Sequence, residues 1–260
     1  MRILGMSVVA VCSVLALASA ASAAGKAPAE YGRVVINSAT GKAGLAPAVF
    51  DHWAHRAKYT CRLCHVDIAF AMKANATGIT AADNMKGVYC GVCHNGKTQS
   101  GGKAVFAACS EDRSDMKRCE RCHMPAVSGG DAEFSALAAK LPKDKFGNGV
   151  NWEKAAEDGV IQPVDYLEGV SIKRPEQPVL KDFSIQPKEA GKGEIIFSHK
   201  KHVLWNGCEV CHPELFMGRK RGATKYSMKE IEQGKFCGVC HTTVAFPIED
   251  CGRCHSQPVK

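Results

Sequence analysis

Hydrophobic side chains are concentrated at the start of the 260-residue chain. Met1 and Arg2 are followed by the apolar run ILGMSVVAVCSVLALASA and then by small residues over 21–23. A positively charged start, an apolar core and an Ala-x-Ala site are typical of a secretory signal peptide. A membrane anchor is the competing interpretation, but the run is close to the minimum length of a span and has no basic stop-transfer flank. We therefore predict a signal peptide over 1–23 and an exported mature protein without stable membrane insertion.

Beyond the leader, the stretches that carry the paired cysteines have too few aliphatic residues for a conventional core. Residues 126–185 contain two proline-bearing stretches, VIQPVDYLEG and IKRPEQPVLKDFSIQP, and proline favours an extended path over a regular helix. The stretch NWEKAAEDG in the same segment predicts one short helix ended by Gly159. We predict a mostly irregular and α-helical fold with minimal β-structure, made of short helices and long loops.

The chain contains an internal repeat. FDHWAHRAKYTCRLCH begins at Phe50, and FSHKKHVLWNGCEVCH begins 147 residues later at Phe197. Both stretches read F-x-H-x-x-H, then five residues, then C-x-x-C-H. The next C-x-x-C-H also recurs after 147 residues, and the one after it recurs after 132. We predict two tandem modules, over 24–125 and 186–260, joined by a linker over 126–185, with a small β-hairpin before each H-x-x-H pair.

The cysteine pattern predicts the cofactor. Of the fourteen cysteines, thirteen follow the leader, and twelve of these form six C-x-x-C pairs, each followed directly by histidine. Zinc also binds paired cysteines, and thiol–disulfide exchange uses one exposed pair, but neither explains the histidine after every pair. A covalent c-type haem does, because the thiols form thioethers with the porphyrin and the adjacent imidazole lies under the iron. We predict six covalently attached c-type haems. The attachment residues are Cys61, Cys64, Cys90, Cys93, Cys119, Cys122, Cys208, Cys211, Cys237, Cys240, Cys251 and Cys254, and the proximal iron ligands are His65, His94, His123, His212, His241 and His255.

Four histidines remain, and all of them lie in the two H-x-x-H pairs: His52, His55, His199 and His202. Residues three apart on a helix share a face but diverge in direction, so such a pair can serve two irons better than it can chelate one. Solvated or core histidines, or a small metal site, are the alternative interpretations. We favour distal iron ligands, because the chain holds no other free histidine and each pair precedes a haem-binding motif.

At this level of detail each module resembles the tri-haem cytochrome c of the c-seven class, within the c-three cytochrome superfamily. The resemblance rests on F-x-H-x-x-H, on three C-x-x-C-H sites in matching order, and on GATKYSMKEIEQGKFCGVCH before a middle haem. It implies that the first histidine of each pair caps the first haem and that the second caps the middle haem. The implied ligand pairs are His52 with His65, His55 with His94, His199 with His212, and His202 with His241.

The third haem of each module, on His123 and His255, has no histidine left for its sixth position. In single-module relatives this ligand lies four residues before the first cysteine of the middle haem, where the present chain has Lys86 and Gln233. The sixth ligand of these two haems can therefore be methionine, lysine, water or a histidine from another molecule.

Methionine spacing narrows this choice. Met124 and Met116 are tied too closely to their own attachment site to turn onto its iron. Met85 lies five residues before the first cysteine of the middle motif in module 1, and Met228 lies nine residues before it in module 2. The two offsets differ by about one helical turn, so both side chains can face the same way. The resemblance suggests a methionine ligand in this segment. We predict Met228 for the His255 haem and Met85 for the His123 haem, with Lys86 as the alternative to Met85.

Charge and function follow from the cofactor. The formal net charge of +8 does not indicate nucleic-acid binding, because haem propionates would offset it.

Bis-histidine iron has no vacant position for a substrate, so we predict an electron carrier without catalytic residues. It would connect redox proteins in the periplasm or at the cell surface: an inner-membrane donor, and a terminal reductase or outer-membrane conduit. The alternative is a multihaem reductase of nitrite, sulfite or a metal oxyanion, with an open iron at a third haem. We interpret Cys109, the unpaired cysteine, as a small buried apolar residue or the relic of a motif, and we favour these over a dimer contact.

Overall fold

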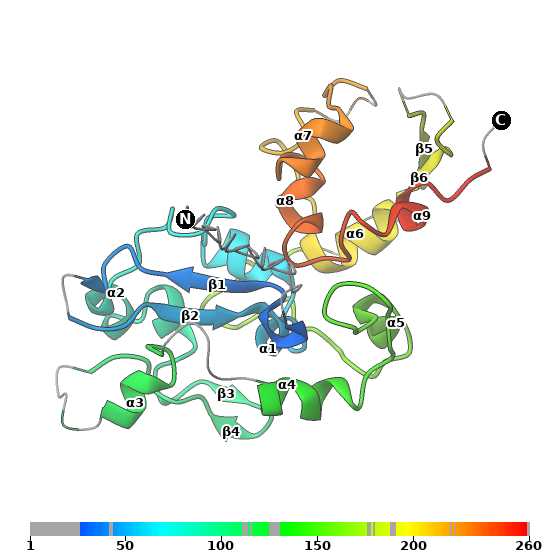
Figure 1. Ribbon diagram of the computed structural model, residues 1–260. Coiled ribbons are helices and arrows are strands. Elements are labelled where there is room, and N and C mark those ends of the chain that lie inside the picture. Colours follow the sequence, from blue (N-terminus) through cyan, green and yellow to red (C-terminus); the bar gives the residue numbers. More distant parts are fainter. Residues whose placement is uncertain are drawn as a thin grey trace, which may run out of the picture.

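The computed structural model describes residues 27–41, 44–110, 114, 116–124, 131–175, 178, 180–187, 191–218, 220 and 222–258. The predicted signal peptide lies outside the described residues. Within them, no helix is long and apolar enough to cross a membrane. Figure 1 shows the N-terminal elements, coloured blue to green, beside the C-terminal elements, coloured yellow to red, with the green helices α4 and α5 along one side.

Module 1 is built of short elements around one hairpin. Strands β1 (Arg33–Ile36) and β2 (Ala48–Asp51) pair antiparallel, with Arg33 opposite Asp51. Strand β2 runs directly into α1 (His52–Arg56), so the hairpin fixes where the first H-x-x-H pair begins. The remaining elements are a 3-10 helix over Pro28–Glu30, a π-helical turn over Leu63–Asp67, α2 (Ala81–Met85), a 3-10 helix over Tyr89–Val92, β3 (Gln99–Ser100), β4 (Lys103–Ala104) and α3 (Met116–Glu120).

Module 2 has the same plan. Strands β5 (Phe183–Ile185) and β6 (Ile195–Phe197) pair antiparallel and lead into α6 (His199–Asn206). The hairpin predicted before each H-x-x-H pair is thus confirmed in both modules, and its first strand here lies at the end of the segment assigned to the linker. The module continues with α7 (Met228–Glu232), α8 (Gly238–His241) and α9 (Cys251–Cys254).

The linker supplies most of the hydrophobic core. It forms α4 (Asp131–Ala138) and α5 (Trp152–Glu157); the second confirms the predicted helix, which is followed by Gly159 at φ +69°. The buried cluster combines Trp53 of α1 with linker side chains, and Trp205 of module 2 packs against it. Its buried members are Ala29, Trp53, Phe134, Ala138, Leu141, Val150, Trp152, Ala155 and Ile161. The linker is therefore a packed element between the modules as well as an extended connection.

The sequence repeat of 147 residues is also a repeat of backbone geometry. Helices α2 and α7 begin at equivalent positions, and each has a capping box, Thr80 with Asp83 and Ser227 with Glu230. Each helix then packs end-on against the middle C-G-V-C-H motif. A Cβ atom added at Gly238 would lie 1.9 Å from the carbonyl oxygen of Ile231, and the equivalent positions in module 1 show the same 1.9 Å. The glycine of this motif is thus required by a close backbone approach.

Salt bridges tie the modules and the linker together. Arg174 of the linker forms salt bridges with Asp67 of module 1 and with Glu209 of module 2, each with an N···O distance of 2.7 Å. The Asp67 side chain is only 2% exposed. Arg253 of α9 bonds Asp144 of the linker at 2.6 Å. Since a buried carboxylate requires a partner, the Arg174 pair holds the two modules at a defined contact.

Candidate functional site: paired histidines and free cysteines

Helix α1 places its two histidines against two different C-x-x-C-H motifs. The His52 ring faces the His65 ring with centroids 6.4 Å apart and planes inclined by 8°. The His55 ring faces the His94 ring at 6.1 Å and 54°. The H-x-x-H spacing therefore directs one imidazole to each of two neighbouring motifs.

Helix α6 repeats half of this arrangement. The His202 ring faces the His241 ring with centroids 6.3 Å apart. The His199 ring lies 5.2 Å from the Phe183 ring and 5.0 Å from the Phe197 ring, and the ring contacts of the described residues do not join it to His212. The structure thus brings together three of the four histidine pairs that the resemblance implies.

Backbone carbonyls orient most of the imidazoles. In eight of the ten histidines, Nδ1 lies 2.6–3.2 Å from a carbonyl oxygen, so Nδ1–H donates and Nε2 keeps its lone pair for a metal. The pairs are His52 with Gly32, His55 with Asp51, His65 with Phe70, His123 with Ala46, His202 with Ser198, His212 with Phe216, His241 with Phe246, and His255 with Gly193. Such bonds fix the tautomer of a metal-binding histidine.

Burial favours the neutral form of five of the ten imidazoles. It lowers the pKa of His52 and of His94 to about 4, and it also lowers the pKa of His55, His202 and His241. A neutral imidazole is the form that binds a metal ion, so the rings are held ready for coordination near neutral pH.

The cysteines of the six motifs are all free thiols among the described residues. Burial raises the pKa of Cys64 and of Cys240 to about 12, so these thiols are neutral. Cys61 of module 1 lies within electrostatic range of Cys211 and Cys240, since it contributes to the raised pKa of both. Motifs from the two modules therefore meet at the module contact.

Cys109 lies apart from the motifs in sequence but close to them in space. It is partly buried, the Asn84 side-chain amide lies 3.8 Å from its sulfur, and burial raises its pKa. Its role in a dimer contact stays a prediction.

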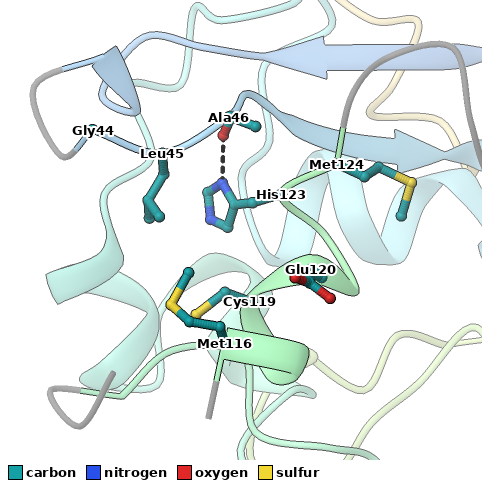
Figure 2. A pocket seen from close by; sticks show the side chains of 8 residues that line it. All are labelled: Gly44, Leu45, Ala46, Met116, Cys119, Glu120, His123 and Met124. Atoms are coloured by element: carbon teal, nitrogen blue, oxygen red, sulfur yellow. Dashed lines mark hydrogen bonds between the residues drawn. The ribbon is translucent and has the colours of Figure 1, made fainter. Parts of the chain in front are cut away.

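The third motif of module 1 borders a cavity of about 470 Å³, which is lined by Gly44, Leu45, Ala46, Met116, Cys119, Glu120, His123 and Met124. Figure 2 shows the His123 ring fixed by the Ala46 carbonyl, with Leu45 and Met116 on the side that the ring faces and Met124 pointing away. Met85 does not line this cavity. Met116, which the spacing argument set aside, is thus the methionine that the structure brings into the cavity beside His123. Only the tertiary position of α3 reveals it.

A haem fits the donor set of these sites. Two metal–nitrogen bonds of about 2 Å, plus about 1 Å from each nitrogen to its ring centre, put two imidazoles on one metal ion roughly 6 Å apart. The observed centroid distances of 6.1–6.4 Å match this value. Each pair also has two free thiols within its own motif, as thioether attachment requires.

Six pairs of thiols, each followed directly by an imidazole, define a multihaem c-type cytochrome, a class of electron-transfer proteins that hold haem covalently. The family model described as "Cytochrome c7 and related cytochrome c" matches residues 48–124 and 195–256, more than half of the chain. The chain belongs to the cytochrome c7 family. The predicted fold class, short helices and small hairpins in two tandem modules, is confirmed.

Three solved structures to which the chain is similar come from one protein, GSU1996. The C-terminal and N-terminal hexahaem fragments of GSU1996 are each 26% identical; each comparison covers 86% of this chain, and 96% and 98% of the fragments, with TM-scores of 0.26 and 0.25. The dodecahaem cytochrome c GSU1996 is 23% identical over 87% of this chain and 75% of its own, with a TM-score of 0.25. No curated protein sequence matches the chain.

Proposed function

We propose that this chain is an exported hexahaem cytochrome that carries single electrons between redox proteins in the periplasm or at the cell surface. The observation that carries the proposal is the set of histidine pairs 6.1–6.4 Å apart, each joining an H-x-x-H histidine to a C-x-x-C-H histidine. An iron held between two imidazoles has both axial positions filled, which suits electron transfer and leaves no site for a substrate.

The six attachment motifs support the count of six haems. The membership of the family supports export, because c-type haem proteins are typically extracytoplasmic. The partners that fit such a carrier are an inner-membrane electron donor and a terminal reductase or outer-membrane conduit. Their contact surfaces would lie where haem edges reach the surface.

The third haems are the exception to bis-histidine ligation in this proposal. Met228 remains the proposed sixth ligand of the His255 haem. For the His123 haem, Met116 is now a candidate beside Met85 and Lys86, because Met116 lines the cavity beside that histidine. The same cavity favours the second candidate function, a reductase with an open iron at His123, if no side chain closes the sixth position.

Replacing the distal histidines singly tests the carrier proposal. His202→Ala should convert one haem, that of His241, from low to high spin in the ferric protein, and His199→Ala should do the same for the His212 haem. Electron paramagnetic resonance on equal amounts of fully loaded protein counts the high-spin irons. Low-spin iron throughout in either variant would remove the corresponding ligand assignment. Sustained turnover of nitrite or sulfite by the unsubstituted protein would replace the carrier with the reductase.

A further inference from the structure

Arg56 ends α1, the helix that carries His52 and His55, and its side chain reaches both the linker and module 2. Its Nη1 atom donates to the carbonyl oxygen of Val244 at 2.5 Å. Its guanidinium carbon lies 4.6 Å from the ring centroid of Trp152 and 5.3 Å from that of Trp205. One cation thus contacts all three parts of the chain.

The carbonyl that Arg56 holds belongs to the segment directly after the middle haem motif of module 2. In this segment the Tyr31 hydroxyl donates to the carbonyl of Ala245 at 2.6 Å. The next carbonyl, that of Phe246, accepts from Nδ1 of His241 at 2.8 Å. Three successive carbonyls therefore accept from two module 1 side chains and from an iron ligand of module 2. The segment connects the orientation of α1 to that of the His241 ring.

The positive charge of Arg56 has no carboxylate partner among the ion pairs and hydrogen bonds of the described residues. Two indole faces and one carbonyl stabilise the guanidinium instead. Arg56 follows His52 by four residues in α1, and the carbonyl that it holds lies three residues after His241. The guanidinium therefore lies beside segments that carry iron ligands in both modules.

Comparison of the two repeats indicates that Arg56 acts at the contact between the modules and not within a single module. The position equivalent to Arg56, 147 residues further on, is Val203 in α6. Helix α6 places His202 against His241 with this apolar residue in place. A module can thus position the distal histidine of its middle haem without an arginine here.

We propose that Arg56 is the electrostatic link between the two modules, whose fixed charge raises the reduction potentials of the two haems that flank the contact, those of His65 and His241. This inference rests on the proposed function, since it requires both haems to be present. Reduction of either haem adds one negative charge. A nearby cation without a carboxylate partner stabilises the reduced haem, and it does so more strongly in a poorly solvated contact. The contact is then the crossing point at which the two modules exchange electrons, and Arg56 is a positioning residue that also tunes it.

Potentiometric titration of the six haems, resolved by nuclear magnetic resonance of the haem methyl groups, tests this in the complete holoprotein. Arg56→Val introduces the residue that module 2 has at the equivalent position, and Arg56→Lys keeps the charge. Tyr31→Phe removes the hydrogen bond to the Ala245 carbonyl without changing the charge. Arg56→Val should shift the reduction equilibrium of two haems about tenfold toward the ferric state, or about 59 mV for a one-electron couple. Arg56→Lys should restore most of that shift, and Tyr31→Phe should leave the potentials in place.

Several results would overturn the inference. Unchanged potentials in Arg56→Val would do so, as would an equal shift of all six haems or equal shifts in the valine and lysine variants. A shift of the same two haems in Tyr31→Phe would assign the effect to docking instead of charge. If Arg56→Val does not mature, Arg56→Gln takes its place in the same comparison. Haem number and spin state are measured on each sample, so that missing or misligated haems in the unsubstituted protein count against the proposed function alone.

Discussion

The close approach between α7 and the middle haem motif of module 2 makes Gly238→Ala informative. The new Cβ atom would lie 1.9 Å from the carbonyl oxygen of Ile231, whereas real Cβ contacts are essentially never under 3.0 Å. More than an ångström of backbone displacement is required. Overpacking of this kind costs about 1–3 kcal/mol, and a helical alanine in place of glycine returns only about 0.5–1 kcal/mol. The clash is with backbone, so the cost falls in the upper half of that range, and we expect a net loss of about 1–2.5 kcal/mol. For a chain of this length, this lowers Tm by roughly 2–10 °C.

The chain provides its own control at the third motif of the same module. Gly252 occupies the same place in C-G-R-C-H, also within a short helix, but a Cβ there has nothing within 4 Å. Gly252→Ala should therefore leave stability unchanged or raise it slightly. Thermal unfolding followed by Soret circular dichroism, on protein with equal haem content, compares the two. Equal Tm values for both variants would refute the packing of α7 on the motif.

Two further predictions concern ligation and module docking. Met228→Ala should abolish a weak sulfur-to-iron band near the red end of the ferric visible spectrum, while Met217→Ala, at a side chain 73% exposed, should retain it; persistence of the band in Met228→Ala would remove this ligand assignment. Arg174→Ala should lower the unfolding free energy by about 2 kcal/mol or more, because it leaves a carboxylate that is only 2% exposed without its partner. Lys154→Ala breaks a pair between side chains 58% and 43% exposed and should cost less than about 0.5 kcal/mol in the same denaturation experiment, so equal losses would contradict the buried contact.

Features encoded over a short stretch of chain could be predicted from the sequence. The hairpins, the cofactor class and the helix at Trp152 each depend on residues close together. The 147-residue offset was recognised in the haem motifs, and the structure extends it to the backbone of α2 and α7. Helix α4 was not predicted, because prolines elsewhere in the segment favoured an extended path. The spacing of Phe134, Ala138 and Leu141, which suits one helix face, was the available signal.

Contacts between distant parts of the chain could not be predicted in this way. Met116 precedes Cys119 by three residues, and only the packing of α3 beside Leu45 brings it into the cavity that His123 borders. The role of Arg56 likewise depends on Val244, 188 residues away. A single sequence contains no local pattern for either contact.

The most direct test of the central claim is the intact mass of the mature holoprotein, purified from cells that attach c-type haem. We predict a mature chain that begins near Ala24 and carries six covalent haem additions. A fully matured protein with five or fewer haems, or with none and its cysteines oxidised to disulfides, would contradict it.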